Sequence, residues 1–172
     1  MAKIRKLEIS NFRAIKQLSW QPSPGVNCLI GPGDSGKSTI LEAIDLCLGA
    51  RRSYNFSDAD FHALDTDSPV IVALTIGDLD DGAKSLDAYG QFLRGYNQTT
   101  GDVQDEPDSG LETVITLVLT VAADLDPQWT LYSDRATAAG ITRNLTWGDR
   151  QKMALMCPKF VRHLAVSFFA AV

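Results

Sequence analysis

The sequence is poor in cysteine and histidine, the residue types that form most structural metal sites. Its three cysteines, Cys28, Cys47 and Cys157, are too few and too widely spaced for a disulfide framework or for paired zinc ligands. The two histidines, His62 and His163, stand alone and indicate no metal site. Because Cys28 and Cys47 lie in apolar stretches, we expect them to be buried, reduced thiols, as suits a reducing cytosol.

Long apolar runs and a surplus of positive charge are also missing. No stretch approaches the ~18 consecutive apolar residues that a membrane-spanning helix requires, and the N-terminal sequence MAKIRKLEIS has no apolar core of signal-peptide length. We therefore expect a soluble, cytoplasmic protein that does not bind a membrane. Lysine and arginine number 16 against 21 acidic residues, for a net charge of −5, so the chain as a whole lacks the basic character of a nucleic-acid-binding domain.

What is present is the length and the patterning of one α/β domain. A chain of 172 residues with 45% apolar content can bury a substantial core. Alternating or continuous apolar residues predict strands, and helical spacing predicts helices. We predict strands over residues 3–10, 15–20, 26–30, 69–76, 111–121, 129–132 and 141–147, helices over 37–48 and 80–93, and irregular segments over 51–68 and 96–110. The first two strands are expected to form a hairpin, and the third is expected to be buried.

Residues 31–38 match the phosphate-binding pattern GxxxxGK(S/T) in full. The predicted strand before them and the predicted helix after them are the context that this pattern requires. Glycines at the two ends let backbone N–H groups converge on an anion without interference from side chains. The helix that follows directs its partially positive N-terminus at the phosphates. The sequence therefore predicts a P-loop that binds ATP with Mg²⁺.

Within this P-loop, Lys37 is expected to contact the β and γ phosphates, and the hydroxyl of Ser38 is expected to be a ligand of Mg²⁺. The residues expected to hold the nucleotide are Gly31, Pro32, Gly33, Asp34, Ser35, Gly36, Lys37, Ser38 and Thr39. Asp34 is unusual, because a unit charge at ~6 Å in an effective dielectric of ~20 repels a phosphate by roughly a few kcal/mol before screening. Either its carboxylate points to solvent, or it weakens the affinity for the nucleotide.

Two stretches carry a family resemblance: Ile9-Ser10-Asn11-Phe12-Arg13 and, some twenty residues later, Leu29-Ile30-Gly31 through Ser38-Thr39-Ile40-Leu41-Glu42-Ala43-Ile44. With these motifs the chain resembles the N-terminal ATPase segment of the OLD (overcoming lysogenization defect) family of ATP-dependent endonucleases, and more broadly the RecF/SMC branch of the ABC ATPases. Residues 54–61 and 147–150 also look OLD-like, so the resemblance covers about residues 3–150.

The resemblance implies an α/β, ABC-type P-loop fold whose mixed sheet includes an antiparallel β portion. It also implies that Arg13 lies near the nucleotide as a phosphate or base contact, although a surface arginine is an equal alternative. The chain departs from the family inside the loop, where relatives usually read G-x-N-G/N-x-G-K-S and this chain has Gly33 and Asp34. The departure affects the expected loop geometry and nucleotide affinity.

The catalytic parts of such an ATPase are not evident, and the catalytic residues are therefore unknown. The family's signature motif, its aspartate-glutamate pair after an apolar strand (Walker B), its switch histidine and its Toprim nuclease domain cannot be found in the sequence. Asp78 and Asp124 follow apolar strands but have no adjacent glutamate. Four glutamines are open candidates for the family's Q-loop: Gln98, Gln104, Gln128 and Gln151.

Two hypotheses follow from this sequence. In both, residues 1–172 form a single partial ABC ATPase domain, with a P-loop lobe over 1–50, a continuation over 51–150 and a tail over 151–172. In the first, the chain is the ATP-binding lobe of an OLD-like endonuclease or ATPase of DNA repair or phage defence. It would act as a homodimer or with a partner ATPase or nuclease subunit, and DNA is implied by the resemblance only. In the second, the chain is a non-catalytic P-loop protein that acts through protein contacts.

Overall fold

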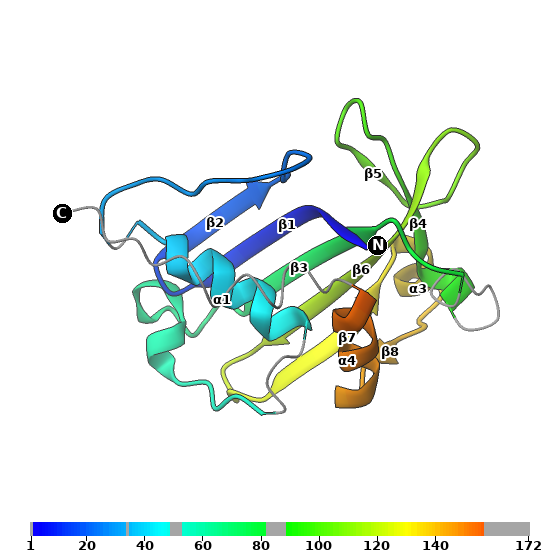
Figure 1. The fold of residues 1–172 in the computed structure, drawn as a ribbon. Coiled ribbons are helices and arrows are strands. Elements are labelled where there is room, and N and C mark those ends of the chain that lie inside the picture. The colour runs from blue at the N-terminus through cyan, green and yellow to red at the C-terminus, as the bar shows by residue number, and fades with distance from the viewer. Residues whose placement is uncertain (1, 34, 49–52, 82–88, 157–172) are drawn as a thin grey trace.

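An antiparallel sheet with helix α1 packed on one face organises the part of the chain that the computed structural model describes, residues 2–33, 35–48, 53–81 and 89–156 (Figure 1). The strands are β1 (Lys3–Phe12), β2 (Ile15–Trp20), β3 (Val70–Gly77), β4 (Leu93–Tyr96), β5 (Val103–Gln104), β6 (Glu112–Val121), β7 (Pro127–Tyr132) and β8 (Arg143–Asn144). The helices are α1 (Lys37–Leu48), α3 (Asp134–Ala138) and α4 (Trp147–Met156), and 3₁₀ turns form at η1 (Asp58–Asp60), η2 (His62–Leu64) and η3 (Gly90–Phe92).

The sheet runs in the order β2-β1-β3-β6, after which two strands share the free edge of β6. β4 pairs with residues 112–115 of β6, and β7 pairs with residues 116–121. β5 and β8 extend the sheet from β4 and β7 respectively. Every strand pair within the described ranges is antiparallel. What this structure contains is thus the antiparallel β portion that the sequence predicts for the fold.

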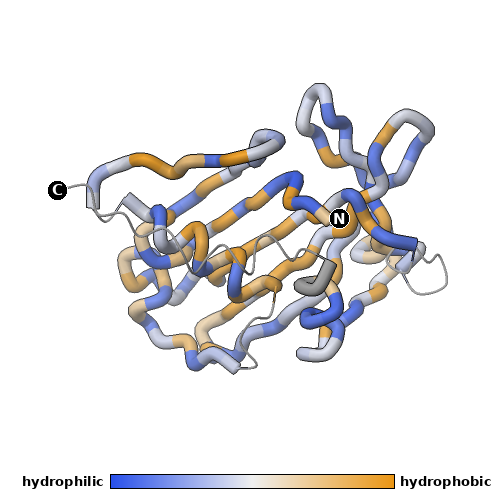
Figure 2. Tube along the Cα trace, in the orientation of Figure 1, coloured by the Kyte–Doolittle hydropathy of each residue, from blue (hydrophilic) through white to orange (hydrophobic). Residues whose placement is uncertain are grey.

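The hydrophobic core lies between α1 and the sheet, and it fixes the helix in place. Leu7 of β1, Val72 of β3 and Leu117 of β6 are at most 1% exposed, and Ile44 and Cys47 of α1 are fully buried. Figure 2 shows the apolar residues concentrated along β3 and β6. Burying one aliphatic side chain contributes about 1.5–3 kcal/mol, so this layer holds the helix, and the loop before it, against the sheet.

Buried apolar residues do not alternate regularly along β1, and this has a structural cause. Ile4 is buried at an even position, whereas Leu7 and Ile9 are buried at odd positions. The pairing of β1 with β3 shifts by one residue between Ile4 and Lys6, which is a β-bulge. A bulge adds one residue to one strand, so it changes which residues face the core. The strand prediction is therefore confirmed, and the bulge reconciles its two phases of alternation.

Most predicted elements of the sheet are confirmed. The hairpin of β1 and β2 forms with Phe12 paired to Ile15. The strands predicted at 69–76, 111–121 and 129–132 appear as β3, β6 and β7, and the helix predicted at 37–48 appears as α1 with the same bounds. Residues 53–68 are irregular apart from the short turns η1 and η2, and buried Phe56 and Phe61 anchor them as expected.

The segment before the P-loop contradicts the prediction of a buried strand over residues 26–30. Val26 and Ile30 are 91% and 93% exposed, and Cys28 is exposed rather than buried. The segment is apolar (Figure 2), yet it lies outside the sheet, whose edge on this side is β2 (Figure 1). A buried strand requires neighbours that take its backbone hydrogen bonds, and none of the strands described here pairs with it.

Two further predictions fail between β3 and β6. The helix predicted over 80–93 is wrong at its C-terminal end, because Leu93 already begins β4. Residues 82–88 of that prediction lie outside the described residues. The loop predicted over 96–110 contains β5, which returns along β4 after a turn held by Asn97, whose side-chain oxygen accepts from the N–H of Thr99 at 2.9 Å. Short strands of this kind depend on pairing that local sequence does not reveal.

The C-terminal third was also predicted incompletely. The strand expected over 141–147 is only two residues long, and helices α3 and α4 were not predicted. The start of α3 does carry a sequence signal, since Ser133 is its N-cap and the hydroxyl accepts from the Ala136 N–H at 3.1 Å. Among the helices that can be described, none is both long and apolar enough to cross a membrane.

Candidate nucleotide-binding site

The P-loop joins helix α1 without an intervening residue. α1 begins at Lys37, and its first turn closes with a hydrogen bond of 2.9 Å from the Ile40 N–H to the Gly36 carbonyl. The helix therefore starts inside the motif, where the sequence predicts that it should. Its N-terminal N–H groups and its partial positive charge are directed to the loop of residues 31–36.

Gly36 is required by the local geometry of the motif, and Gly31 lies close to the Ser35 side chain. Gly36 has φ +84°, a left-handed conformation that favours glycine, and a Cβ atom there would lie 3.1 Å from Cγ1 of Ile15. A Cβ atom on Gly31 would lie 2.8 Å from Oγ of Ser35. The glycines at the two ends of the pattern thus allow a loop that folds closely on itself and on the β1–β2 turn.

The Lys37 ammonium lies over this loop. Its Nζ donates to the carbonyl oxygens of Gly31 at 2.7 Å and Pro32 at 2.5 Å, and to Oγ of Ser35 at 3.0 Å. These three acceptors span the loop, so the side chain is already where the motif needs a cation. Phosphate oxygens would compete well for this ammonium, because charge-assisted hydrogen bonds to an anion are stronger than those to neutral carbonyls.

The two hydroxyl residues after Lys37 differ in accessibility. Ser38 is exposed, whereas Thr39 is 7% exposed. A metal ion at the loop could therefore reach the Ser38 hydroxyl more readily than that of Thr39, and the role of Ser38 as a ligand of Mg²⁺ stays a prediction. Pro32, Gly33 and Ser35 are exposed as well. Asp34, the unusual carboxylate of the motif, lies outside the described residues.

Arg13 lies in an ion-pair network rather than on an open surface. Its Nε donates to Oδ1 of Asp60 at 2.8 Å, its Nη1 to Oε2 of Glu42, and its Nη2 to the Tyr54 hydroxyl at 2.5 Å. Burial lowers the pKa of the guanidinium, but the bond to Asp60 and the charge of Glu42 outweigh burial and raise that pKa above its ordinary value. Arg13 therefore links β1 to α1 and to the 53–68 segment.

The other residues of the Asn-Phe-Arg motif hold the same segment. Asn11 is 7% exposed, and its side-chain Nδ2 donates to the carbonyls of Asp65 at 2.8 Å and Ser68 at 2.6 Å. Phe12 is fully buried and forms a β-bridge with Phe61. The motif that carries the family resemblance thus has a local physical function, which is to attach the segment before β3 to the end of β1.

The remaining sequence candidates do not gather at the loop in any contact that the structure records. Asp78 directly follows β3, and Lys3 pairs with it at 3.2 Å and lowers its pKa. Asp124 lies in the β6–β7 turn and accepts the Asp126 N–H at 3.1 Å. Gln98 donates to Glu112 at 2.9 Å. The other three glutamines are distributed over different elements: Gln104 on β5, Gln128 on β7 and Gln151 on α4.

Neither His62 nor any cluster of metal-binding side chains forms a further site in the described residues. His62 contacts the Arg13 carbonyl through Nδ1 at 2.8 Å, which is a structural contact. In the described ranges, no three side chains of His, Cys, Asp or Glu gather as metal ligands would. Cys47 is fully buried, as predicted, and burial raises the pKa of its thiol to about 12.

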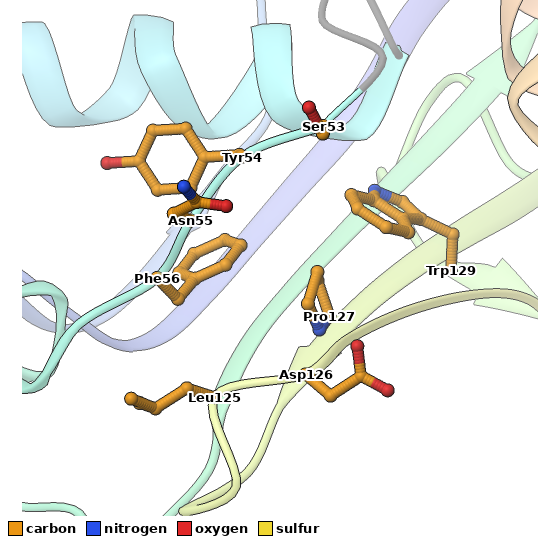
Figure 3. Close-up of a pocket in the computed structure, with 8 residues that line it drawn as sticks. All are labelled: Ser53, Tyr54, Asn55, Phe56, Leu125, Asp126, Pro127 and Trp129. Atoms are coloured by element: carbon orange, nitrogen blue, oxygen red, sulfur yellow. The ribbon is translucent and has the colours of Figure 1, made fainter.

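A shallow cavity of about 400 Å³ lies elsewhere on the molecule, and sequence reasoning gave no indication of it. Residues 53–56 form one wall, and the β6–β7 turn with Trp129 forms the other (Figure 3). Trp129 donates from Nε1 to the Leu46 carbonyl at 3.0 Å, which places the cavity at the C-terminal end of α1. A helix of 12 residues is about 18 Å long, so this cavity is distinct from the P-loop at the other end.

Arg150, from the stretch 147–150 that looks OLD-like, lies at the same end of α1. It is 3% exposed, and its guanidinium carbon lies 3.7 Å from the centre of the Trp129 ring. Burial lowers its pKa, and its Nε and Nη1 have no hydrogen-bond partner among the residues that the structure describes. Stacking on an indole and proximity to a helix C-terminus both favour a cation, so Arg150 contributes to the packing of α4 on α1.

Comparison with known proteins places this architecture in a family. Residues 6–125 match the family profile described as AAA domain (AAA_23). The DNA replication and repair protein RecF of Chlorobium limicola is 30% identical over 112 residues, which are 59% of this chain and 31% of the relative. RecF of Nitrosococcus oceani is 50% identical over 54 residues, 31% of this chain and 15% of the relative. The matched part is thus less than a third of the length of these curated relatives.

Solved structures of SMC proteins have the same fold at low sequence identity. A chain from work on ATP-driven dimerization and DNA-stimulated activation of SMC ATPases matches with a TM-score of 0.55 and 17% identity, covering 98% of this chain and 85% of that chain. The Smc head domain from Pyrococcus yayanosii matches with a TM-score of 0.56 and 18% identity, covering 90% of this chain and 25% of that chain. The fold is that of an ABC-type P-loop ATPase. This chain belongs to the AAA domain family.

Proposed function

We propose that this chain is a nucleotide-binding lobe that holds ATP with Mg²⁺ at residues 31–39. The observation that carries the proposal is the junction of loop and helix. α1 begins at Lys37 directly after Gly36, which has φ +84°, and the ammonium lies over the loop carbonyls. Such a junction presents N–H groups and a helix N-terminus to an anion. The exposed Ser38 hydroxyl adds an oxygen donor of the kind that Mg²⁺ prefers.

The residues present fit the nucleotide, and each has a distinct part in holding it. Lys37 would exchange its carbonyl acceptors for phosphate oxygens, and Ser38 would orient the metal ion. Bound Mg²⁺ would neutralise charge that develops on the phosphates. Binding at this loop needs only the groups that the lobe itself carries.

Hydrolysis, in this proposal, needs a second lobe. A carboxylate must orient the attacking water, and further donors must stabilise the γ-phosphate. The proposal of such a lobe is supported by the exposed apolar residues Val26 and Ile30 and by the edge strand β2, which pairs only with β1 among the described strands. A strand that pairs with residues 26–30 would bury these side chains and hold the loop from its N-terminal side. The catalytic carboxylate would then come from that lobe.

The broader assignment follows the resemblance of the sequence motifs. We propose that the lobe belongs to an OLD-like ATP-dependent endonuclease or a related ATPase of DNA repair or phage defence, with DNA as its ultimate partner. The relatives named DNA replication and repair proteins support a role on DNA. The SMC work on ATP-driven dimerization supports a homodimer or a partner ATPase or nuclease subunit as the source of the missing groups.

The first test is equilibrium binding of ATP and ADP in the presence of Mg²⁺, measured by titration calorimetry. Lys37→Ala is expected to weaken the affinity by about 100-fold or more, because it removes the cation that the motif directs at the β and γ phosphates. The matched control is Lys16→Ala, which removes the same charge from an exposed position on β2. Equal affinities for the wild-type protein and Lys37→Ala would exclude the P-loop as the binding site.

The second test is phosphate release by the purified chain, with Lys37→Ala as the blank. We expect turnover at the level of the blank, because each missing catalytic group costs a factor of about 10² to 10³. Turnover that is proportional to protein and well above the blank would mean that this chain holds the catalytic carboxylate itself. Asp78 and Asp124 would then be the first residues to replace.

A further inference from the structure

Arg13 follows β1, and its side chain contacts the P-loop helix α1 and the 53–68 segment. The Arg13–Ala14 turn joins β1 to β2, and the next residue, Ile15, packs on Gly36 of the loop. On its other side the Arg13 side chain pairs with Glu42, in the second turn of α1. The turn therefore contacts both the loop and the helix that follows it.

The backbone of this turn is held in an unfavourable conformation. Arg13 has φ +48° and Asn11 has φ +55°, in the left-handed region that non-glycine residues rarely adopt. Such conformations are strained and persist where the surroundings hold them. Here the Arg13 N–H donates to the Asp60 carbonyl at 2.9 Å, and the Arg13 carbonyl accepts from His62. The turn is thus fixed on both its backbone and its side chain.

The charges around Arg13 oppose a direct role on phosphate. One guanidinium faces two carboxylates, those of Glu42 and Asp60, so the cluster carries a net negative charge. Each of its three nitrogens already donates to a protein group. A phosphate would have to displace Glu42 to gain the same contact, at a site where the remaining charge repels it.

We infer that Arg13 is a positioning residue of the P-loop and that it acts through Glu42 on α1 and through Ile15 on Gly36. The inference rests on the proposed nucleotide binding by the loop, and it assigns Arg13 a role different from the phosphate or base contact that the family resemblance implies. The two roles predict opposite effects for one substitution, Glu42→Gln. If Arg13 positions the loop, losing the negative charge that pairs with it weakens nucleotide binding. If Arg13 binds phosphate, losing a competing carboxylate strengthens it.

The experiment compares Arg13→Gln, Glu42→Gln and the double variant in the full chain. Both single variants are expected to weaken ATP affinity by roughly 2- to 30-fold, the range for contacts that act on a site indirectly. The ATP affinity of the double variant is expected to match that of the single variant that binds ATP more weakly, because the effects of two substitutions that break one contact are not additive. The matched control is Glu106→Gln, the same change at an exposed residue, which is expected to leave the affinity unchanged.

A second measurement decides the question without nucleotide. The Ile40 N–H bonds to the Gly36 carbonyl at the start of α1, and its hydrogen exchange reports the order of the loop–helix junction. Both Arg13→Gln and Glu42→Gln are expected to speed exchange there, while Glu106→Gln does not. Tighter ATP binding by Glu42→Gln, or unchanged exchange in both variants, would overturn the inference. If the wild-type protein bound no ATP, and Arg13→Gln and Glu42→Gln still exchanged faster than the wild-type protein, the proposed function would be refuted but the positioning role would be supported.

Discussion

Two apolar stretches of this chain have similar compositions and opposite environments. In β3, Val70 and Ile76 are at most 2% exposed, whereas Val26 and Ile30 in the segment before the P-loop are 91% and 93% exposed. β3 has β1 on one side and β6 on the other, and both take its backbone hydrogen bonds. Residues 26–30 have no such neighbour among the strands described here. The comparison shows that an apolar run is buried by its partners and not by its own composition.

The difference bears directly on function, because the less supported stretch leads into the P-loop. The helix side of the loop is anchored by a buried core, by Arg13 and by Trp129. On the N-terminal side of the loop, the side-chain amide of Asn27 exchanges hydrogen bonds with the Ser23 backbone at 2.8 Å, which are contacts within the same exposed segment. A partner that supplied a strand beside residues 26–30 would bury them, so that the segments on both sides of the P-loop would be held by packing.

The largest expected contrast is in thiol reactivity, in a Cys157→Ser background at pH 8 with Ellman's reagent. Cys28, in the exposed stretch, should react rapidly. Cys47 is fully buried and its pKa is raised by burial from 9.0 to about 12, so it should carry about a thousandfold less thiolate than an unperturbed thiol and react at least that much more slowly. Unfolding in urea should make the two equal. Similar rates in the folded protein would contradict the exposure difference.

The next contrast uses one substitution at both stretches. Ile76→Ala, in β3, should destabilise the protein by about 2–5 kcal/mol, because it leaves a cavity in a packed core. Ile30→Ala should change the stability by less than about 0.5 kcal/mol, since its side chain is exposed. Urea unfolding followed by circular dichroism measures both. Comparable losses in the two variants would show that residues 26–30 are buried in solution.

The smallest contrast lies within the P-loop itself. Gly36→Ala should cost about 1–2 kcal/mol, because alanine is strained at φ +84° and its methyl group would press on Ile15. Gly33→Ala meets no atom within 4 Å, and should stay within about 0.5 kcal/mol of the wild-type protein or be slightly more stable. Thermal unfolding of both variants provides the measurement. A neutral Gly36→Ala variant would mean that the loop does not keep this conformation.

Sequence reasoning succeeded where a residue's role depends on its near neighbours. The bounds of α1 follow from the spacing of Ile40, Ile44 and Leu48, and the hairpin of β1 and β2 follows from adjacent strand patterns. It failed where distant segments decide, as for the C-terminal end of the predicted helix at Leu93, which pairs with Ile115 of β6 instead. The N-cap Ser133 of α3 was a local signal that could have been used.

For the candidate site the same division holds. The P-loop residues could be recognised from the sequence because the phosphate-binding geometry is local, with glycine, lysine and hydroxyl residues within eight consecutive positions. The surroundings of Arg13 could not be predicted from the sequence, since its partners Glu42, Tyr54 and Asp60 lie 29 to 47 residues away along the chain. Which charged groups surround an arginine is decided by packing, and the surrounding charges determine whether it can bind an anion.

The sequence by itself determined the motif, the helix that follows it and the hairpin of β1 and β2, because each is specified by propensities and periodicities over a few residues. Only the tertiary structure decided that Arg13 is enclosed by two carboxylates, that a bulge shifts the phase of β1, and that residues 26–30 lack a described neighbour. The physical reason is the same in each case. Burial, ion pairing and strand pairing are energies between segments, and a segment's own residues do not specify its partners.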